Sequence, residues 1–406
     1  MLTETHDLRS GAVPWEDQTA KRPASDPFPK GHVEVAILGS GVMGAIIAER
    51  LSEGTRRLAL FDRRPPGCGS TAASTAQIMW AMDVPLSRLT DKLGESEAVR
   101  RWQRVREAVS DLADRIARHR IACSLRMRPT LYLAGDVLDE AGLADEARLR
   151  QRHDLPSEFL EAEAAAERFG ITRRAAIVSH GNFEVDPVRL CHGCLEQARR
   201  RGASLTYPVN ITALHSEGDS VVLEAEDGRS CRADNVILAT GYERPTLLLP
   251  QAFRLHATFA IATPPGHVET AAARAMIWEA SDPYLYVRTD RDGRIIAGGE
   301  DVDCVDTAAR NGMTGSKAGR IASQLEALLK CRPIRIDRQW SATFGSSPDS
   351  LPGIGRSSSM PHVWLAAGFG GNGIAFASLA AGLLERELQG GTDPDRECFD
   401  PYRFRS

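Results

Sequence analysis

The apolar positions near the start of the chain change from a strand-like run to a helical run across a short turn. Residues 33–38 predict a buried strand, and residues 45–51 predict a helix. A second strand is predicted at residues 57–61 and ends at Asp62. This order is typical of the first unit of a doubly wound α/β sheet. The turn contains three glycines, Gly39, Gly41 and Gly44.

Helical spacing dominates the next part of the chain. Apolar residues recur every three or four positions from residue 84 to about residue 119, which predicts a helical insertion beyond a simple doubly wound sheet. Residues 130–134 predict a strand, and residues 139–170 return to helical spacing with a solvated charged face. Asp186-Pro187 predicts the start of another helix, because proline is favoured at the first helical position.

The second half of the chain is richer in predicted strands. The last of them leads into a second glycine turn at residues 368–374, which opens a helix to about Leu388. The strands are predicted at residues 177–185, 204–214, 221–225, 235–239, 257–263, 284–288, 294–299 and 363–367.

Size and composition narrow the class of protein. At 406 residues two domains are expected, and the polar residues 1–31, with four prolines, predict an extended arm that Trp15 anchors. The chain is 42% hydrophobic with a net charge of −4, so no nucleic-acid partner is indicated. No apolar run reaches the about 20 residues that cross a bilayer, and no secretory signal is recognisable. We expect a cytoplasmic enzyme without membrane insertion, and we assign no metal site.

The eight cysteines are scattered, which is typical of reduced thiols in a reducing compartment. Cys191 and Cys194 have the C-x-x-C spacing of redox pairs, which beside a redox cofactor would indicate a disulfide reductase. However, the apolar residues around them recur at helical spacing. We therefore interpret both as buried structural thiols and keep the redox pair as the alternative.

The first glycine turn has the chemistry of a phosphate-binding site. Gly39 permits the tight turn, Gly41 lets a pyrophosphate approach the backbone, and Gly44 lets the helix pack closely on the strand. The free N–H groups and the positive dipole end of that helix attract a phosphate. Asp62, 18 residues after Gly44, stands where an acid would bind ribose hydroxyls. We predict dinucleotide binding, and a structural turn with incidental glycines is the alternative.

Two further stretches of small residues predict other walls of this site. The loop at residues 63–76 would let backbone N–H and hydroxyl groups reach a phosphate or a flat ring, although a polar surface loop is the alternative. The glycine turn at residues 368–374 provides a second helix N-terminus and therefore a second partial positive charge. Two such termini suit a ligand with two ends.

One predicted strand carries candidate substrate-binding side chains. Alternation places Tyr284, Tyr286 and Arg288 on the same face of a strand. Two phenols and a guanidinium on one face could hold a substrate carboxylate. A solvent-exposed polar face of an antiparallel sheet is the alternative.

Together these motifs resemble those of the D-amino acid oxidase, glycine oxidase and sarcosine oxidase superfamily of flavoproteins. The resemblance extends from residue 33 to about residue 390. It rests on the first glycine turn with its acid at Asp62, and on residues 69–73, 239–241, 284–299, 348–355 and 368–374.

The resemblance implies an α/β protein with a Rossmann-like FAD-binding domain and an inserted antiparallel-sheet substrate domain. The implied FAD-binding domain consists of residues 32–86, 176–245 and 341–395, and the substrate domain of residues 87–175 and 246–340. The ADP half of FAD is expected at the first glycine turn and the isoalloxazine ring at the second. The residues implied to bind FAD are Gly39, Gly41, Val42, Met43, Gly44, Asp62, Arg63, Ser70, Thr71, Ala72, Val209 through its backbone, Gly241, Gly371, Asn372, Gly373 and Ile374.

The resemblance also implies hydride transfer from the C–N bond of an amino acid or amine to the flavin, followed by hydrolysis of the imine. Oxygen is the expected acceptor, giving hydrogen peroxide, and a dehydrogenase with another acceptor is the first alternative. An NAD(P)-linked dehydrogenase and a flavin-binding protein without activity are further alternatives. No side chain is assigned as catalytic, because the flavin does the chemistry.

The chain departs from the family pattern at two places. Members with covalent flavin carry a histidine in the first loop or a cysteine before the Pro-Asp stretch, where this chain has Ala72, Ala73 and Ser341. Noncovalent FAD is therefore predicted. Members similar to sarcosine oxidase place arginines after that loop, where this chain has Gln77-Ile-Met-Trp80. That difference disfavours N-methylglycine as substrate and makes Gln77 and Trp80 candidates for the substrate pocket.

Overall fold

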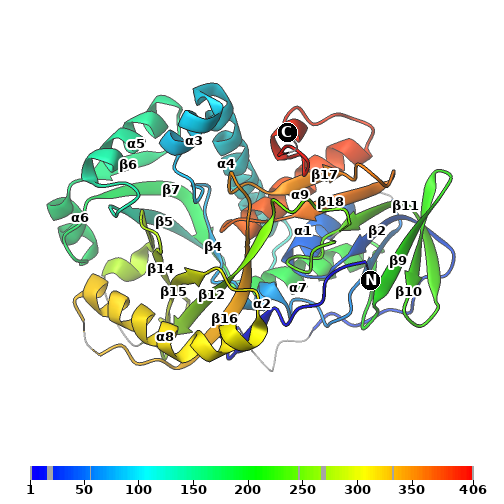
Figure 1. The fold of residues 1–406 in the computed structure, drawn as a ribbon, viewed down its shortest axis with the longest axis horizontal. Coiled ribbons are helices and arrows are strands. Elements are labelled where there is room, and N and C mark those ends of the chain that lie inside the picture. Colours follow the sequence, from blue (N-terminus) through cyan, green and yellow to red (C-terminus); the bar gives the residue numbers. More distant parts are fainter. Residues whose placement is uncertain are drawn as a thin grey trace.

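Two sheets with their covering helices lie side by side in the computed structural model, which describes residues 2–15, 22–54, 56–245, 247–266, 271–331 and 333–404 (Figure 1). The eight-stranded sheet has β17-β18-β11-β2-β3-β8 as its main order, and β9 and β10 extend it through β11. Its strands are β2 (His32–Leu38), β3 (Leu58–Phe61), β8 (Ser204–Thr206), β9 (Ile211–Glu217), β10 (Ser220–Ala225), β11 (Ser230–Leu238), β17 (Gly353–Arg356) and β18 (Val363–Ala367).

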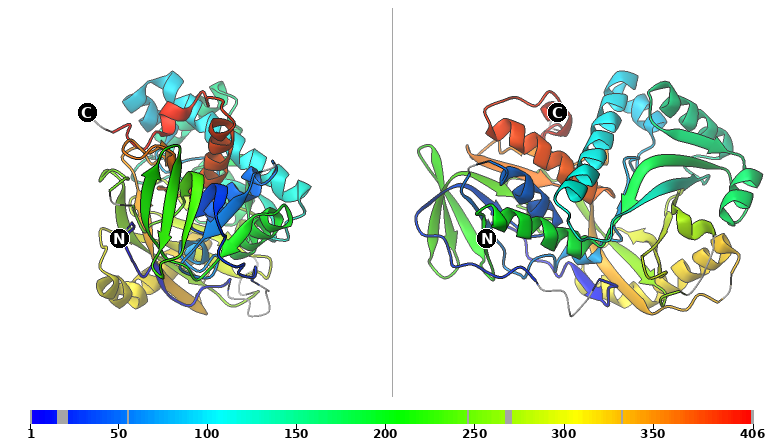
Figure 2. Two further views of the ribbon diagram at one scale, coloured as in Figure 1. Left: turned by 90° about the vertical axis from the view of Figure 1, so that its right-hand side faces the viewer. Right: turned by 180° about the vertical axis from the view of Figure 1, so that it is seen from behind.

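The centre of this sheet is parallel. β11 pairs in parallel with β18 and β2, β2 with β3, and β3 with β8. All four residues of β3 are buried, as expected for a parallel strand that is covered on both faces. The helices α1 (Val42–Leu51), α7 (Pro187–Arg200) and α9 (Gly373–Leu388) lie together behind the sheet, with α1 in contact with both neighbours (Figure 2).

The ten-stranded sheet forms the second unit, in the order β1-β16-β12-β15-β14-β13-β5-β7-β4, with β6 paired to β7. Helix α8 (Thr307–Leu329) contacts β12, β15 and β16, and so covers one face. The strands are β1 (Arg9–Gly11), β4 (Gln77–Ile78), β5 (Arg126–Leu133), β6 (Ser157–Leu160), β7 (Ala176–Glu184), β12 (Arg254–Ala262), β13 (Met276–Glu279), β14 (Leu285–Thr289), β15 (Ile295–Val302) and β16 (Arg338–Ser346).

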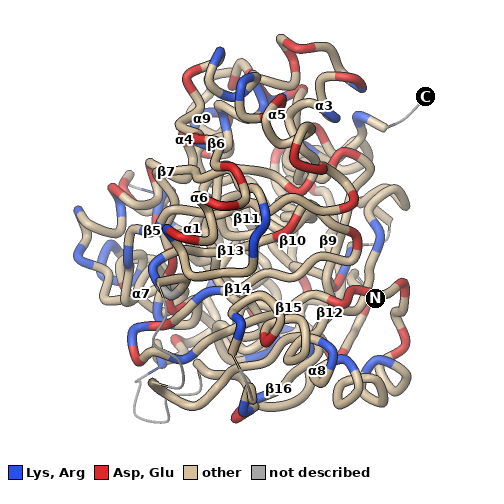
Figure 3. The backbone as a smooth tube through the Cα atoms, turned by 90° about the vertical axis from the view of Figure 1, so that its left-hand side faces the viewer, with Lys and Arg blue, Asp and Glu red and all other residues tan. Residues whose placement is uncertain are grey.

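The remaining helices cluster around one end of this sheet and its junction with the first unit (Figure 1). They are α2 (Ser70–Ala73), α3 (Leu86–Leu93), α4 (Glu95–Arg118), α5 (Glu140–Arg152) and α6 (Ala162–Phe169), with the short 3-10 turn η1 (Ala271–Arg274). A second 3-10 turn, η2 (Arg396–Phe399), contacts β17 of the first unit. None of the helices in the described part of the chain combines the length and the apolar character needed to cross a bilayer. Basic and acidic positions are interspersed in Figure 3, in keeping with the small net charge.

Several predicted segments differ from the observed elements. The helical segment expected at residues 139–170 contains strand β6 between α5 and α6, and the strand expected at residues 204–214 is two strands separated by Pro208, which has no N–H for a sheet. β7 and β16 belong to the ten-stranded sheet, although residues 176–184 and 341–346 were expected with the FAD-binding segments.

The N-terminal arm adds to the fold more than was expected. Residues 9–11 form β1, which pairs antiparallel with β16 and so extends the ten-stranded sheet. Val13 and Trp15 are buried, and the Trp15 indole donates to the Ser74 carbonyl oxygen at 3.0 Å. Trp15 therefore anchors the arm against the loop at residues 63–76.

Candidate active site

One cavity extends along the junction of the two sheets. It is lined by both glycine turns, by the loop at residues 63–76 and by strands of the ten-stranded sheet. The residues of the expected FAD site that line it are Gly39, Gly41, Val42, Met43, Asp62, Arg63, Ser70, Thr71, Val209, Gly241, Gly371, Asn372, Gly373 and Ile374.

The first glycine turn brings the backbone of α1 to the cavity. Gly39 has φ +113°, and a Cβ there would lie 2.2 Å from the Ala239 carbonyl oxygen. A Cβ on Gly44 would lie 1.9 Å from the Gly39 carbonyl oxygen, so α1 can approach β2 only without that atom. Gly41 is the N-cap of α1 and supplies no side-chain hydrogen bond to the helix. The positive end of α1 therefore opens toward the cavity.

Asp62 and Thr71 hold the backbone of this turn through side-chain hydrogen bonds. The Asp62 carboxylate accepts hydrogen bonds from the Ser40 N–H at 2.7 Å and from the Arg64 N–H at 2.9 Å. Thr71 Oγ1 accepts from the Val42 N–H at 2.9 Å. Val209 also lines the cavity. Its N–H donates to the Asp62 carbonyl oxygen at 2.7 Å, so the expected backbone contact with FAD would use the Val209 carbonyl oxygen.

The N-terminal arm covers the same end of the cavity, where Leu2, Thr3 and Leu8 line the wall. Arg63 donates to the Glu4 carbonyl oxygen at 3.0 Å and pairs with Glu243 at 2.7 Å. The sequence does not predict that residues of the arm line the cavity, because a polar arm has no periodic pattern that predicts its long-range partners.

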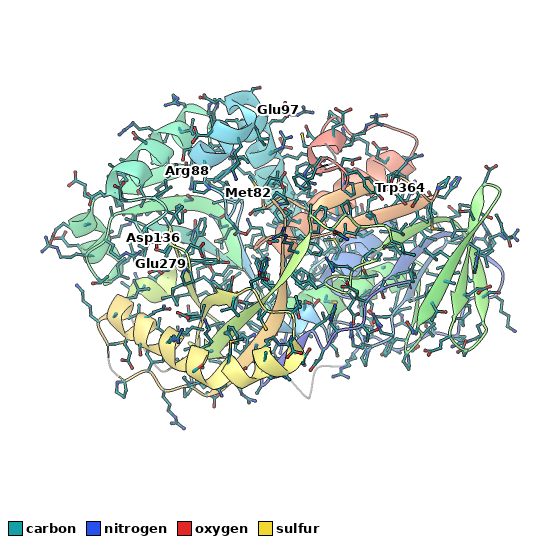
Figure 4. All side chains as sticks on the ribbon, in the orientation of Figure 1. Met82, Arg88, Glu97, Asp136, Glu279 and Trp364 are labelled. Carbon is teal, nitrogen blue, oxygen red and sulfur yellow. The ribbon has the colours of Figure 1, made fainter. Side chains whose placement is uncertain are left out.

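The second glycine turn forms the other half of the cavity. Asn372 is the N-cap of α9, and its side chain donates to the Ala81 carbonyl oxygen at 2.8 Å instead of capping the helix. The Gly371 N–H donates to Asp83 Oδ2 at 2.7 Å, and a Cβ on Gly371 would lie 2.5 Å from Asp83 Oδ1. Asp83 follows Met82, which Figure 4 labels near the middle of the molecule.

Unpaired polar atoms also point to a bound ligand. Ser70 Oγ and both amide atoms of Gln77 are buried, have no hydrogen-bond partner in the described part of the chain, and belong to residues that line the cavity. Buried polar atoms without partners are costly. Together with the two open helix ends, they fit an extended ligand that has hydrogen-bonding groups along its length, as FAD has.

One part of the cavity wall is aromatic. We call it the aromatic chamber and define it by Tyr242, Trp278, Tyr284, Tyr286, Thr258, Asp83 and Asp301. The rings of Tyr284 and Tyr286 lie 5.7 Å apart at 44°, and the Trp278 indole stacks on Tyr132 at 3.9 Å. Trp278 is the sheet partner of Tyr286 across β13 and β14.

Hydrogen bonds from its backbone to two carboxylates hold the segment between β13 and β14 in place. Glu279 Oε2 accepts from the Leu285 N–H at 3.0 Å, and Asp136 Oδ1 accepts from the Asp282 N–H at 3.0 Å. Figure 4 labels both acids, which lie close together at this edge of the sheet. These bonds set the position of Tyr284 at the start of β14.

A model of the FAD dependent oxidoreductase (DAO) family matches residues 34–386. The chain belongs to this family. FAD, rather than the nicotinamide dinucleotide of the alternative prediction, is therefore the cofactor of this family, and the predicted superfamily and fold class are confirmed.

Curated relatives of this FAD-dependent oxidoreductase are distant. Glycine oxidase of Bacillus subtilis is 23% identical over 404 residues, which cover 92% of this chain and 98% of that protein. Mitochondrial dimethylglycine dehydrogenase of Mus musculus is 23% identical over 419 residues, which cover 94% of this chain. The chain spans 45% of the length of that second protein.

Solved structures show the same fold. The crystal structure of glycine oxidase from Geobacillus kaustophilus superposes with a TM-score of 0.76 at 18% identity, covering 93% of this chain and 100% of that chain. L-proline dehydrogenase from P. horikoshii has a TM-score of 0.74 at 20% identity, covering 92% and 98% of the two chains.

Four of the expected site residues do not line the cavity. Gly44 and Ala72 lie behind its wall. The Trp80 indole is fully buried and donates to the His180 carbonyl oxygen at 2.8 Å, so it belongs to the core. Arg288 is buried against Glu184 at 3.3 Å and donates to the Val185 carbonyl oxygen at 2.9 Å. The other three candidates for the substrate pocket, Gln77, Tyr284 and Tyr286, line the cavity.

The ionisable groups of the chamber are shifted toward their uncharged forms. Burial raises the pKa of Asp301 to about 6, against a hydrogen bond from Thr258 that lowers it. Burial raises the pKa of Asp83 and raises that of Tyr242 to about 12. The phenols therefore remain protonated at neutral pH, while Asp301 titrates near it.

The C-x-x-C pair lies inside the first unit. Asp186 caps α7 by accepting from the Val188 and Arg189 N–H groups at 3.0 Å. Cys191 and Cys194 lie on the buried face of that helix as free thiols, and burial raises the pKa of both. The prediction that both thiols are buried is confirmed. A thiol that stays protonated is a poor nucleophile, which disfavours the redox alternative.

Proposed function

We propose that this FAD-dependent oxidoreductase oxidises a C–N bond of an amine or amino acid and that the resulting imine is hydrolysed by water. The observation that carries the proposal is a single cavity that contains both helix N-termini suited to FAD and continues into the aromatic chamber. Relatives named glycine oxidase and dimethylglycine dehydrogenase support this reaction class.

Bound FAD would supply the hydride acceptor, so the protein needs no strong base of its own. The tasks left to the chain are binding and orientation. The open end of α1 would bind the pyrophosphate of FAD and the open end of α9 would face its isoalloxazine ring, each through backbone N–H groups. The chamber would position the substrate carbon from the side of the ten-stranded sheet, through Tyr284 and Tyr286 of the β13–β14 hairpin.

We propose oxygen as the electron acceptor, which would release hydrogen peroxide. A dehydrogenase that passes electrons to another acceptor is the second candidate, because relatives of both kinds match the chain. We also propose noncovalent FAD, since the first loop has Ala72 and Ala73.

The visible spectrum of the purified protein tests these proposals. Flavin absorption should bleach without oxygen on addition of an amine or amino acid substrate. Return of the absorption in air together with peroxide would support an oxidase, and return only with an artificial acceptor would support a dehydrogenase. A flavin that no amine or amino acid reduces would contradict the proposed reaction.

A further inference from the structure

Among the described residues, carboxyl groups line the chamber and no lysine or arginine does. Among the described residues that line the cavity, the lysine and arginine side chains are those of Arg63 and Arg64. Both pair with Glu243, at 2.7 Å and 2.5 Å, at the end covered by the N-terminal arm. Asp83 and Asp301 are the acids of the chamber. A substrate carboxylate would thus lie beside two carboxyl groups, without a lysine or arginine among the described lining residues to neutralise it.

A bulge in β15 brings Asp301 to the chamber. Gly298 pairs with Ala260 and Gly299 with Phe259, but the register shifts before Ala257 pairs with Val302. The extra residue, Glu300, has φ +57° and directs its carboxylate to Lys317 of α8 at 3.0 Å, on the opposite face of the sheet. Asp301 therefore faces the chamber beside Thr258.

Glycine makes room for the aromatic walls. A Cβ on Gly298 would lie 2.3 Å from the Tyr286 hydroxyl, and a Cβ on Gly345 would lie 2.6 Å from the Tyr242 ring. Without those atoms, Tyr286 can lie across β15 and Tyr242 across β16. The walls therefore consist of aromatic rings, which attract cations through their negative faces.

Two polar atoms of the chamber have no hydrogen-bond partner among the described residues. Asp301 Oδ1 and Trp278 Nε1 are buried and have no hydrogen-bond partner in the described residues, and the Trp278 side chain is only 4% exposed. A carboxylate oxygen accepts from an ammonium N–H, whereas an indole N–H donates to an acceptor elsewhere on the ligand. An unpaired acceptor beside several aromatic rings is suited to an ammonium group.

We propose that the substrate of this site is an amine that binds as a cation and carries no carboxylate next to the oxidised C–N bond, with its ammonium paired to Asp301 and enclosed by Tyr242, Tyr284 and Tyr286. This inference rests on the proposed oxidation of a C–N bond and names its substrate class. Asp301 Oδ1 would accept a proton from the ammonium N–H, which leaves a lone pair on the nitrogen. That lone pair would form the C=N bond as the neighbouring C–H bond breaks and its hydride passes to the FAD that the proposed function requires.

Binding to the holoenzyme tests recognition separately from turnover. Tetramethylammonium and pivalate have similar shapes and opposite charges, and each can be titrated while the flavin spectrum is recorded. The inference predicts that tetramethylammonium perturbs the spectrum at concentrations at least about tenfold lower than pivalate, a difference of about 1.4 kcal/mol. Tighter binding of pivalate, or no perturbation by tetramethylammonium, would overturn it.

Two matched variants test whether the Asp301 carboxylate is the group that binds the cation. Asp301→Asn should weaken tetramethylammonium binding at least about tenfold, while Asp303→Asn, two residues along at an exposed position, should leave it unchanged. Equal affinity in the Asp301→Asn holoenzyme would overturn the assigned role of this carboxylate. If that variant loses its flavin, the comparison of the two ions on the unaltered holoenzyme decides the proposal.

Anaerobic reduction separates this inference from the proposed function. N-methylbutylamine and N-methylglycine share the oxidisable group and differ in the carboxylate. Faster reduction by N-methylbutylamine supports the inference. Faster reduction by N-methylglycine overturns it and leaves the proposed function standing, whereas reduction by no amine or amino acid overturns the proposed function itself.

Discussion

At the scale of single residues, the Asp301 carboxyl should make cation binding depend on pH. Its pKa is raised to about 6, with burial as the main cause, Asp83 and Asp282 raising it further, and Thr258 and Lys317 opposing the shift. The group is therefore ionised above about pH 6 and uncharged below it.

We predict that tetramethylammonium affinity is full at about pH 8 and falls as the pH decreases through about 6, because the carboxylate is lost. Titration of the holoenzyme over this range measures the effect, and the Asp301→Asn variant should show a nearly flat profile. The same decline in both proteins would assign the pH dependence to another group.

We expect Arg288 to stabilise the fold and not to bind the substrate. It stands four residues after Tyr284, about 13 Å along an extended strand, and this distance carries it beyond the chamber to Glu184. Arg126 and Arg128 also pair with Glu184, so its carboxylate keeps partners when Arg288 is removed.

The variant Arg288→Leu should therefore lower the free energy of unfolding by less than the roughly 3–5 kcal/mol typical of an isolated buried pair. We expect about 1–3 kcal/mol in chemical denaturation, with little change in KM. A large rise of KM for a carboxylate substrate, with unchanged stability, would restore the original hypothesis that Arg288 binds substrate.

The residues of the chamber illustrate how far the sequence predicts a site. Strand alternation correctly places Tyr284 and Tyr286 on the face that lines the cavity. It does not place Asp301, because a bulge changes which residue faces the chamber and has no periodic signal. Asp83 and Trp278 come from separate segments, so only their long-range packing brings them to the same wall.

At the scale of elements, the turn between β2 and α1 should tolerate no added atom at Gly44. A Cβ there would lie 1.9 Å from the Gly39 carbonyl oxygen, so α1 would have to move away from the sheet. Gly54, just after α1, has no atom within 4 Å of its Cβ position and serves as a matched control.

Gly44→Ala should therefore reduce the FAD content of the purified protein and destabilise it by about 1–3 kcal/mol. Gly54→Ala should change neither quantity. Flavin absorbance per protein and thermal unfolding measure both effects. Full FAD content in Gly44→Ala would contradict the close packing of α1 on β2.

The N-terminal arm should retain the cofactor. It contributes β1 to the sheet, lines the cavity with Leu2, Thr3 and Leu8, and contacts Arg63 through Glu4. A chain that lacks residues 1–13 should release FAD severalfold faster than the full chain when flavin fluorescence is followed after dilution. An unchanged release rate would limit the arm to a structural role.

Local signals predicted some elements and missed others for physical reasons. The glycine turns and the Asp186-Pro187 cap have strong local chemistry, and α1, α7 and α9 begin where that chemistry places them. Helix α8 was not predicted, because glycines at positions 312, 315 and 319 weaken its pattern. β1 has three residues and exists only through its pairing with β16.

At the scale of the whole molecule, function depends on how the two sheets meet. The sequence predicts a parallel sheet with dinucleotide chemistry, and the family resemblance predicts an inserted antiparallel sheet. Neither predicts which strands cross the junction. β7 and β16 join the ten-stranded sheet although their neighbours in sequence belong to the first unit, and β16 contributes Ala342, Thr343 and Phe344 to the cavity wall.

The most direct test of the account is anaerobic reduction of the purified holoenzyme by N-methylbutylamine, followed by the visible spectrum. A cavity that holds FAD at the two helix ends and a cationic amine in the aromatic chamber predicts complete bleaching of the flavin. It also predicts much slower bleaching with N-methylglycine, whose carboxylate would meet Asp301 and Asp83. A flavin that stays oxidised with every amine and amino acid would contradict the account at its centre.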